Sequence, residues 1–298
     1  MKDQTPFTER IITRGIQLSG YSSILFVGLI LYFLVSEGIP TFSEVSLSNL
    51  LSIRWYPIEN YFGLLPLLLG TILVTLGAAL VAIPFGVGTA IYISEIAPAW
   101  LKEILKPFVE ILAGLPSVML GFLGILVVSP FLRRFLDLPT GLTAFTGALL
   151  LAGIALPTIV SVAEDALNTV PRAYREAALA VGATRWQTIW GVTLPAARSG
   201  VLTAVILGVG RAIGETMTVM MVTGNAPVMP IKWFSLFAPV RTMTATVASE
   251  MGEVATGSTH YHVLFLIGII LFLISLAVNI TASAIVFRQP KRSERILS

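Results

Sequence analysis

The sequence Glu-Ala-Ala-Leu-Ala-Val-Gly at residues 176–182 decides the fold, because it lies in a sizeable polar segment between two long apolar stretches. Gly182 can adopt the left-handed backbone conformation that ends a helix, and Thr-Arg-Trp-Gln at residues 184–187 is a capping box that begins another. We predict two short helices joined at Gly182, with Thr169 as the N-cap of the first helix and Pro171 in its first turn.

The first of these helices has the composition of a docking element. Ala177 and Ala178 form a small face on which the backbone of another protein can come close, and Arg172, Arg175 and Glu176 form a charged rim that would orient it. The alternative is an amphipathic loop without a partner. We favour docking.

The composition is that of a multi-pass membrane protein. The chain has 298 residues, of which 55% are hydrophobic and only 12% are charged, whereas soluble domains carry roughly 25% charged residues. It has no cysteine and only two histidines, His260 and His262, which excludes disulfides, thiolate metal sites and histidine-built metal sites. No nucleophile–base arrangement can be assembled, so we expect no metal, no cofactor and no enzymatic activity in the chain itself. The net charge of +3 gives no reason to expect a nucleic-acid partner.

Six apolar stretches predict an all-α protein with six transmembrane helices in one membrane domain, residues 16–287. A cytoplasmic segment at 1–15 precedes this domain, a tail at 288–298 follows it, and the polar loop 166–197 lies within it. The predicted spans cover about residues 16–36, 64–93, 107–130, 140–163, 198–222 and 263–287.

The distribution of basic residues predicts the orientation. With both termini on one side, that side carries thirteen Lys and Arg residues and the other side carries five. Cytoplasmic loops carry the excess of basic residues, so the termini and the loop 166–197 should be cytoplasmic. The first apolar stretch lacks a small-residue cleavage site, and we expect it to remain as an uncleaved span.

A charged pair lies inside the predicted fifth span, at residues 198–222. An ionisable residue near the middle of a span costs at least about 2.5–3.5 kcal/mol, so Arg211 is expected to face a cavity or a partner. Glu215 follows four residues later, which places it on the same face of a continuous helix. One interpretation is a substrate path, and the other is a structural ion pair in which the two residues only neutralise each other.

Further polar residues extend the predicted substrate path. Thr218 falls on the same helix face one turn after Glu215, and Ser117 follows the helix-interrupting Pro116 in the predicted third span. Ser117 could line the path or cap the backbone. Arg211 offers a planar fork of donors to an oxyanion, and a carboxylate such as Glu215 can accept a hydrogen bond from the proton of hydrogen phosphate, which sulfate lacks.

The loop 166–197 resembles the "EAA" coupling loop of ABC-importer permeases, with Val192 where that family usually has Ile. The matching residues are Glu176, Ala177, Ala178, Gly182, Leu194 and Pro195. The resemblance implies the six-helix bundle of type I, MetI-like importer permeases with a cytoplasmic coupling helix. The chain has no G-x-x-x-x-G-K-[ST] loop, so two ATP-binding partner subunits would have to supply ATP hydrolysis.

The sequence Gly-Arg-Ala-Ile-Gly-Glu-Thr-Met-Thr-Val-Met-Met-Val-Thr-Gly-Asn at residues 210–225 resembles phosphate-transport permeases of the PstC type. Residues 62–67, 94–98 and 113–118 share the similarity. It implies a bacterial or archaeal inner-membrane subunit paired with a PstA-type sister permease and fed by a periplasmic or lipid-anchored phosphate-binding protein. Alternatives are a permease for molybdate, sulfate or phosphonate, a secondary transporter that uses the charged pair as a proton relay, and an intramembrane enzyme.

Overall fold

The computed structural model describes the backbone of residues 7–230 and 233–287. The predicted tail at 288–298 and the start of the predicted N-terminal segment lie outside the described residues. Within them, the regular secondary structure is helical apart from one isolated bridge and one antiparallel two-stranded hairpin, in which Trp55 pairs with Phe62 and Tyr56 with Tyr61.

The helices run in a single series from α1 to α14. Their bounds, with those of the strands, are α1 Phe7–Gly38, α2 Thr41–Glu44, α3 Leu47–Leu50, β1 Trp55–Tyr56, β2 Tyr61–Phe62, α4 Leu65–Ile91, α5 Ala99–Gly114, α6 Ser117–Leu123, α7 Ser129–Phe135, α8 Ala144–Asn168, α9 Arg172–Ala180, α10 Arg185–Thr188, α11 Leu194–Gly214, α12 Met217–Val222, α13 Met243–Glu250 and α14 Thr259–Phe287. Three π-helical turns, Tyr92–Ile96, Gly124–Val128 and Ile189–Thr193, extend α4, α6 and α10 at their C-terminal ends.

Six helical stretches of the described chain are long and apolar enough to cross a membrane, as predicted. They are Ile12–Glu44, Leu65–Ile96, Ser117–Phe135, Ala144–Asn168, Arg185–Gly214 and Thr259–Thr281.

Two of these stretches differ from the predicted spans at a helix break. The expected span at 107–130 is divided at Leu115 and Pro116, so that α5 is a separate helix and the membrane-length stretch begins at Ser117. Pro116 cannot donate a helical hydrogen bond and holds Leu115 extended, which explains this break. The expected span at 198–222 is divided after Gly214.

The body of the protein is a tight bundle of α4, α8 and α11. Ile159 of α8 is fully buried between Gly86 of α4 and Gly208 of α11. A Cβ atom at Gly86 would lie 2.7 Å from Cγ2 of Ile159, and one at Gly208 would also collide with Ile159. These small residues therefore let three long helices approach one another around a single branched side chain.

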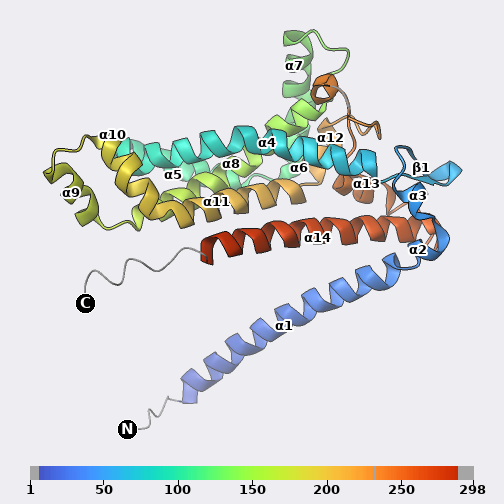
Figure 1. The fold of residues 1–298 in the computed structure, drawn as a ribbon, viewed down its shortest axis with the longest axis horizontal. Helices are drawn as coiled ribbons and strands as arrows, with labels where there is room; N and C mark the ends of the chain where they lie inside the picture. The colour runs from blue at the N-terminus through green and yellow to red at the C-terminus, as the bar shows by residue number, and fades with distance from the viewer. Residues whose placement is uncertain (1–6, 231–232, 288–298) are drawn as a thin grey trace.

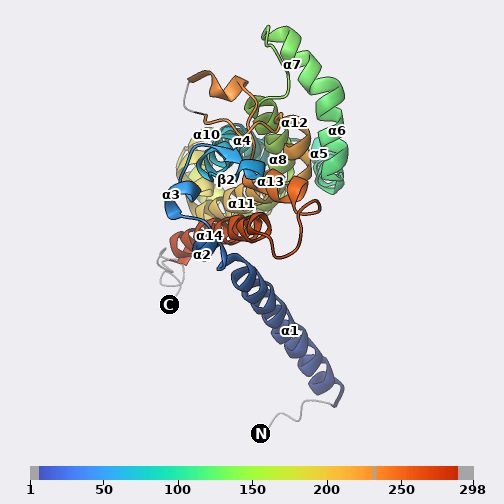
Figure 2. The same cartoon turned by 90° about the vertical axis from the view of Figure 1, so that its right-hand side faces the viewer.

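Two elements extend away from this bundle (Figure 1 and Figure 2). The C-terminal part of helix α1 contacts α14, and the rings of Phe33 and Phe265 lie there edge to face with centroids 5.4 Å apart. Toward its N-terminus, α1 diverges from the body. The stretch from α6 to α7 runs across the direction of the other long helices. Both carry many exposed apolar side chains, among them Phe26, Phe122 and Phe131.

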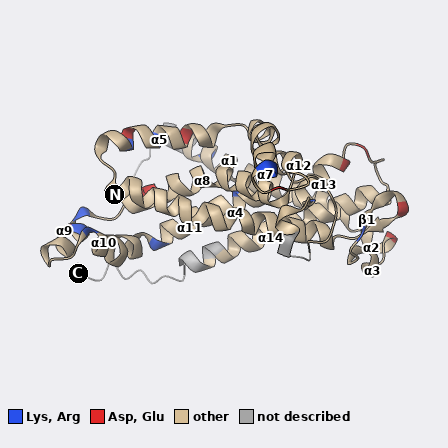
Figure 3. Ribbon diagram, turned by 90° about the horizontal axis from the view of Figure 1, so that it is seen from above, with Lys and Arg blue, Asp and Glu red and all other residues tan. Residues whose placement is uncertain are grey.

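The long helices bring different elements to the two ends of the molecule. Helices α9 and α10 lie at one end with the start of α1 and the end of α14, whereas α2, α3, the β-hairpin and α13 lie at the other (Figure 1). Figure 3 shows little charge along the middle of the long helices and basic residues gathered near α9. We call these the α9 end and the hairpin end.

A carboxylate whose side chain is only 16% exposed joins the elements of the hairpin end. Glu250 Oε1 accepts a hydrogen bond from Trp55 Nε1, at 3.2 Å, and forms an ion pair with Arg241 Nη1, at 2.7 Å, and its other oxygen is 2.8 Å from His260 Nε2. Burial by itself raises the pKa of Glu250, but the hydrogen bond with His260, the Arg241 charge and the Trp55 N–H outweigh it and lower the pKa below its ordinary value.

Candidate functional site

The helix α9, Gly182 and the helix α10 form the expected helix–glycine–helix unit. Gly182 has a φ of 88°. Its N–H donates to the carbonyl of Leu179 at 3.0 Å, and the N–H of Ala183 donates to the carbonyl of Ala178 at 3.1 Å. This pair of bonds is a Schellman motif, which satisfies the last carbonyls of α9 and turns the chain sharply into α10.

The start of α10 is the predicted capping box. The side chain of Thr184 accepts from the N–H of Gln187 at 3.3 Å, and the side chain of Gln187 accepts from the N–H of Thr184 at 2.8 Å. The predicted start of α9 was wrong by a few residues. Pro171 is itself the N-cap residue, and Thr169 belongs to the end of α8, where its hydroxyl donates to the carbonyl of Ala166 at 2.7 Å.

The surface of this unit is open and more apolar than the sequence interpretation allowed. Glu176 and Ala177 are exposed, and Ala178 is half-buried. Around them the structure exposes the large apolar side chains Tyr174, Leu179, Val181, Trp186 and Trp190. Exposed apolar groups beside charged ones are typical of a protein-binding surface.

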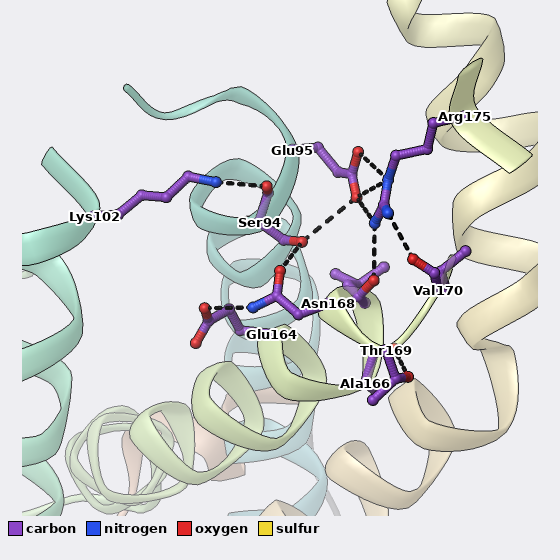
Figure 4. Close-up of polar contacts among 10 residues, drawn as sticks. Ser94, Glu95, Lys102, Glu164, Ala166, Asn168, Thr169, Val170 and Arg175 are labelled. Atoms are coloured by element: carbon purple, nitrogen blue, oxygen red, sulfur yellow. Dashed lines mark hydrogen bonds and ion pairs between the residues drawn. The ribbon is translucent and has the colours of Figure 1, made fainter. Parts of the chain in front are cut away.

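Arg175, which we expected on the exposed rim, instead points into the protein (Figure 4). Its guanidinium contacts Glu95, at the end of α4, with Nη2 to Oε1 at 2.6 Å and Nε to Oε2 at 3.2 Å. Only 20% of the Arg175 side chain and 9% of the Glu95 side chain are exposed. Sequence reasoning missed Glu95, because eighty positions separate the two residues and no local pattern joins them.

The second cluster lies where α5 ends and α6 begins. Arg211 of α11 donates from Nη1 to the hydroxyl of Thr158, at 3.1 Å, and from Nη2 to the carbonyl of Ala113, at 3.2 Å. Ala113 is in the last turn of α5, where carbonyls lack helical partners and positive charge is favourable. The Arg211 side chain is exposed.

Glu215 does not share a helix face with Arg211, contrary to prediction. Helix α11 ends at Gly214, and Glu215 is extended. The Glu215 carboxylate accepts the N–H of Thr218 at 3.2 Å, in the first turn of α12. The carboxylate therefore binds a backbone N–H that has no partner within the helix, at a helix start, where negative charge is favourable. Within the described residues, neither Arg211 nor Glu215 has an ion-pair partner.

Thr218 and Ser117 meet directly in this cluster. The Thr218 hydroxyl donates to the backbone carbonyl of Ser117 at 2.8 Å, and the Thr218 side chain is fully buried. The carbonyl of Glu215 in turn accepts the hydroxyl of Thr244, from α13, at 3.2 Å. The four predicted substrate-path residues thus lie around two helix breaks, α5–α6 and α11–α12, that contact each other, with Arg211 exposed and Thr218 buried.

Comparison with known proteins shows which family the chain belongs to. The family model for binding-protein-dependent transport system inner membrane components matches residues 82–291, more than half of the chain. The chain belongs to this family. Its members are inner membrane components by description, in agreement with the six membrane-length helices of the described chain.

Several curated proteins are similar to this family member along most of its length. A probable ABC transporter permease protein, YqgH of Bacillus subtilis, is 40% identical over 248 residues, which are 82% of this chain and 79% of the relative. The phosphate transport system permease protein PstC of Mesorhizobium japonicum is 35% identical over 84% of this chain and 81% of its own. PstC of Pasteurella multocida is 32% identical over 91% and 89%. The resemblance to PstC-type permeases is confirmed.

Solved importer structures share the fold of this family member. An inward-facing MetNI methionine ABC transporter structure aligns with a TM-score of 0.56 at 20% identity, over 78% of this chain and 98% of that one. A bacterial alginate ABC transporter in complex with a pentasaccharide-bound periplasmic protein aligns at 0.58 with 15% identity, over 90% and 94%. The predicted MetI-like bundle is confirmed by these likenesses.

Proposed function

We propose that the chain is the membrane-spanning permease subunit of an ATP-driven importer of inorganic phosphate. The observation that carries the proposal is Arg211. Among the residues that the structure describes, only a hydroxyl and a backbone carbonyl hold its exposed guanidinium. An incoming anion would replace two neutral acceptors and would not have to break an ion pair. The relatives named as phosphate transport permeases support phosphate as that anion.

The proposed mechanism is alternating access driven from the α9 end. Two ATP-binding subunits would dock on Glu176, Ala177, Ala178 and the exposed apolar side chains around them. Their closure on ATP would move α9, and the helices attached to it would open the path around Arg211 to one side of the membrane or the other. The whole complex, and not this chain alone, would be the ATP-driven translocase.

We place the α9 end in the cytoplasm. The start of α1 and the end of α14 share this end, and the excess of basic loop residues supports it. Residues 1–15, which precede the membrane domain 16–287, and residues 288–298, which follow it, would then both be cytoplasmic. The hairpin end would face outward and receive the phosphate-loaded binding protein.

A sister permease of the PstA type would complete the path. Helix α1 and the stretch from α6 to α7 leave the bundle and expose apolar side chains that a second permease chain can cover. These elements and the exposed Arg211 would then lie at the interface of a heterodimer. Lipid would cover what the sister chain does not.

The nearest alternative is a permease for another oxyanion. Glu215 favours hydrogen phosphate over sulfate, because a carboxylate accepts a hydrogen bond from the phosphate O–H and repels an anion without one. The complete complex in proteoliposomes should take up labelled phosphate only with ATP and the binding protein, and excess sulfate or molybdate should leave that uptake unchanged. Competition by either anion as strong as that of unlabelled phosphate would assign a different substrate.

Docking on α9 is tested separately with Glu176→Lys. Glu176 is exposed and has no side-chain partner in the part of the chain that the structure describes, so the variant should reach the membrane at a normal level. It should lose co-purification with the ATP-binding subunit and lose phosphate uptake. Normal uptake by this variant would overturn the docking assignment.

A further inference from the structure

The side chain of Arg175 attaches helix α9 to the membrane helices. Arg175 donates from Nη1 to the carbonyl of Val170, at 2.7 Å, and from Nη2 to the carbonyl of Leu167, at 2.9 Å, in addition to its fork on Glu95. It thus ties α9 to the end of α8 and to the end of α4 at once (Figure 4). A lysine could not make these contacts together, since it lacks the planar fork.

The attachment continues from Glu95 into a third helix. Ser94, beside Glu95, donates its hydroxyl to Asn168 of α8 at 2.9 Å, and Asn168 donates to Glu164 at 2.8 Å. Lys106 of α5 lies 3.2 Å from Glu164. The hydrogen bond with Glu164, the main cause, raises the pKa of Lys106 above its ordinary value of 10.5, so the charged form is the one that this contact stabilises.

Helix α5 connects this network to the anion site. Lys102, on the same helix, donates to the carbonyl of Ser94 at 2.7 Å, so two lysines in the first half of α5 are held by this network. At its other end the carbonyl of Ala113 holds Arg211. Helix α5 therefore contacts Ser94 and Glu164, which neighbour the partners of Arg175, through its first half, and it contacts the residue that would meet phosphate through its last turn.

We infer that Arg175 and Glu95 are positioning residues that transmit movement of α9 to the transmembrane helices. The inference rests on the proposed function, in which ATP-binding subunits dock on the exposed side of α9. Arg175 and Glu95 face the other side of that helix and take no part in the docking surface. Their loss should leave docking and ATP hydrolysis in place and separate both from transport.

The test compares three variants in the complete complex, reconstituted in vesicles. Arg175→Gln and Glu95→Gln each remove one half of the pair, and Glu103→Gln is the matched control, an exposed carboxylate of α5 without a side-chain partner in the described chain. We expect the ATP-binding subunit to co-purify with all three. Phosphate taken up per ATP hydrolysed should fall about tenfold in the first two, which is within the scale of measured coupling effects, and should stay unchanged in the control.

A second measurement separates transmission from folding. The chain has no cysteine, so Glu95→Cys with Arg175→Cys can be joined by a short bifunctional thiol reagent, in a complex whose other subunits lack reactive cysteines. Joining the two positions should restore uptake per ATP, because it replaces the lost attachment. Unchanged coupling in both glutamine variants would overturn the inference, and so would a cross-linked complex that hydrolyses ATP but still fails to transport.

The two proposals fail in different ways. If the ATP-binding subunit does not dock on α9, Glu176→Lys will co-purify with it normally, and the proposed function is wrong. If docking is correct and transmission is not, Glu176→Lys will lose the subunit while Arg175→Gln transports with normal coupling.

Discussion

At the scale of single residues, the hydrogen-bond partners of Arg211 differ from those of a charge in a buried ion pair. Removing one partner of a buried ion pair costs about 3–5 kcal/mol because the other charge is left uncompensated. Arg211 has neutral partners and an exposed side chain, so its release from Thr158 and Ala113 is a smaller change. The guanidinium can therefore exchange partners during transport without stranding a carboxylate.

The geometry of Arg211 predicts how its variants behave. Arg211→Gln should abolish phosphate uptake, Arg211→Lys should be impaired because an ammonium lacks the fork, and Arg211→Gln with Glu215→Gln should remain inactive. All three should reach the membrane at normal levels. Uptake and membrane abundance are measured in the same vesicles, and restored uptake in the double variant would show that the two residues act as a structural pair.

The sequence selected a group of residues that lie together in the structure, but it did not predict their contacts. Arg211, Glu215, Thr218 and Ser117 lie around two adjoining helix breaks, and they were selected by their residue types within apolar spans. Periodicity placed Glu215 on the face of Arg211 because it assumed a continuous helix. The inward direction of Arg175 depends on Glu95, eighty positions away, and no local pattern contains that information.

At the scale of elements, helix ends were predictable wherever one residue type decides the backbone. Gly182 ends α9 and Thr184 begins α10, both as expected. Pro116 separates α5 from α6. Pro84, in contrast, lies inside α4 without ending it, because neighbouring helices can stabilise a membrane helix that continues through a proline.

The left-handed conformation of Gly182 gives an element-scale prediction. A side chain there would meet open space, so the cost is that of the backbone alone, about 1–2 kcal/mol. Gly182→Val should therefore distort the turn between α9 and α10 and reduce co-purification of the ATP-binding subunit and phosphate uptake. Gly182→Asn is the matched control, since asparagine tolerates this conformation, and it should retain most of both. Equal loss in the two variants would remove the conformational argument.

The Glu250 cluster predicts a pH dependence of stability. The ordinary pKa of this carboxyl is 4.5 and its folded value is lower. Its stabilisation is therefore complete above pH 4.5 and is lost as the pH falls through the folded value. Glu250→Gln should lower the melting temperature at pH 7 and have a smaller effect in acid. Glu253→Gln, an exposed neighbour, should change neither, and an equal effect of Glu250→Gln at all pH values would contradict the assignment.

At the scale of the whole molecule, the number and type of membrane helices followed from composition, but their arrangement did not. Apolar length predicts a span and says nothing about its direction within the bundle. The crossing path of α6 and α7 and the divergence of α1 depend on what packs beside them. The close approach of α4, α8 and α11 depends on Gly86 and Gly208 meeting Ile159, which are far apart in the sequence.

The orientation can be measured on the intact chain. A cysteine at Arg185, exposed at the α9 end, should react with an impermeant thiol reagent only from the cytoplasmic side. One at Ile58, which is 85% exposed in the hairpin, should react only from outside. The cysteine-free parent chain is the control for labelling. The opposite pattern would reverse the topology inferred from the basic residues.

The shortness of α9 has a consequence for engineering. Its nine residues fall below the roughly 12–15 residues that a helix needs to be even marginally stable alone in water. Its shape is therefore supplied by the body, through Arg175 and the turn at Gly182. A synthetic peptide of residues 166–197 would be unstructured and a poor competitor for the ATP-binding subunit. The same segment grafted into another membrane protein would keep its sequence but would not fold into the helix, unless Glu95 and the end of α8 were transferred with it.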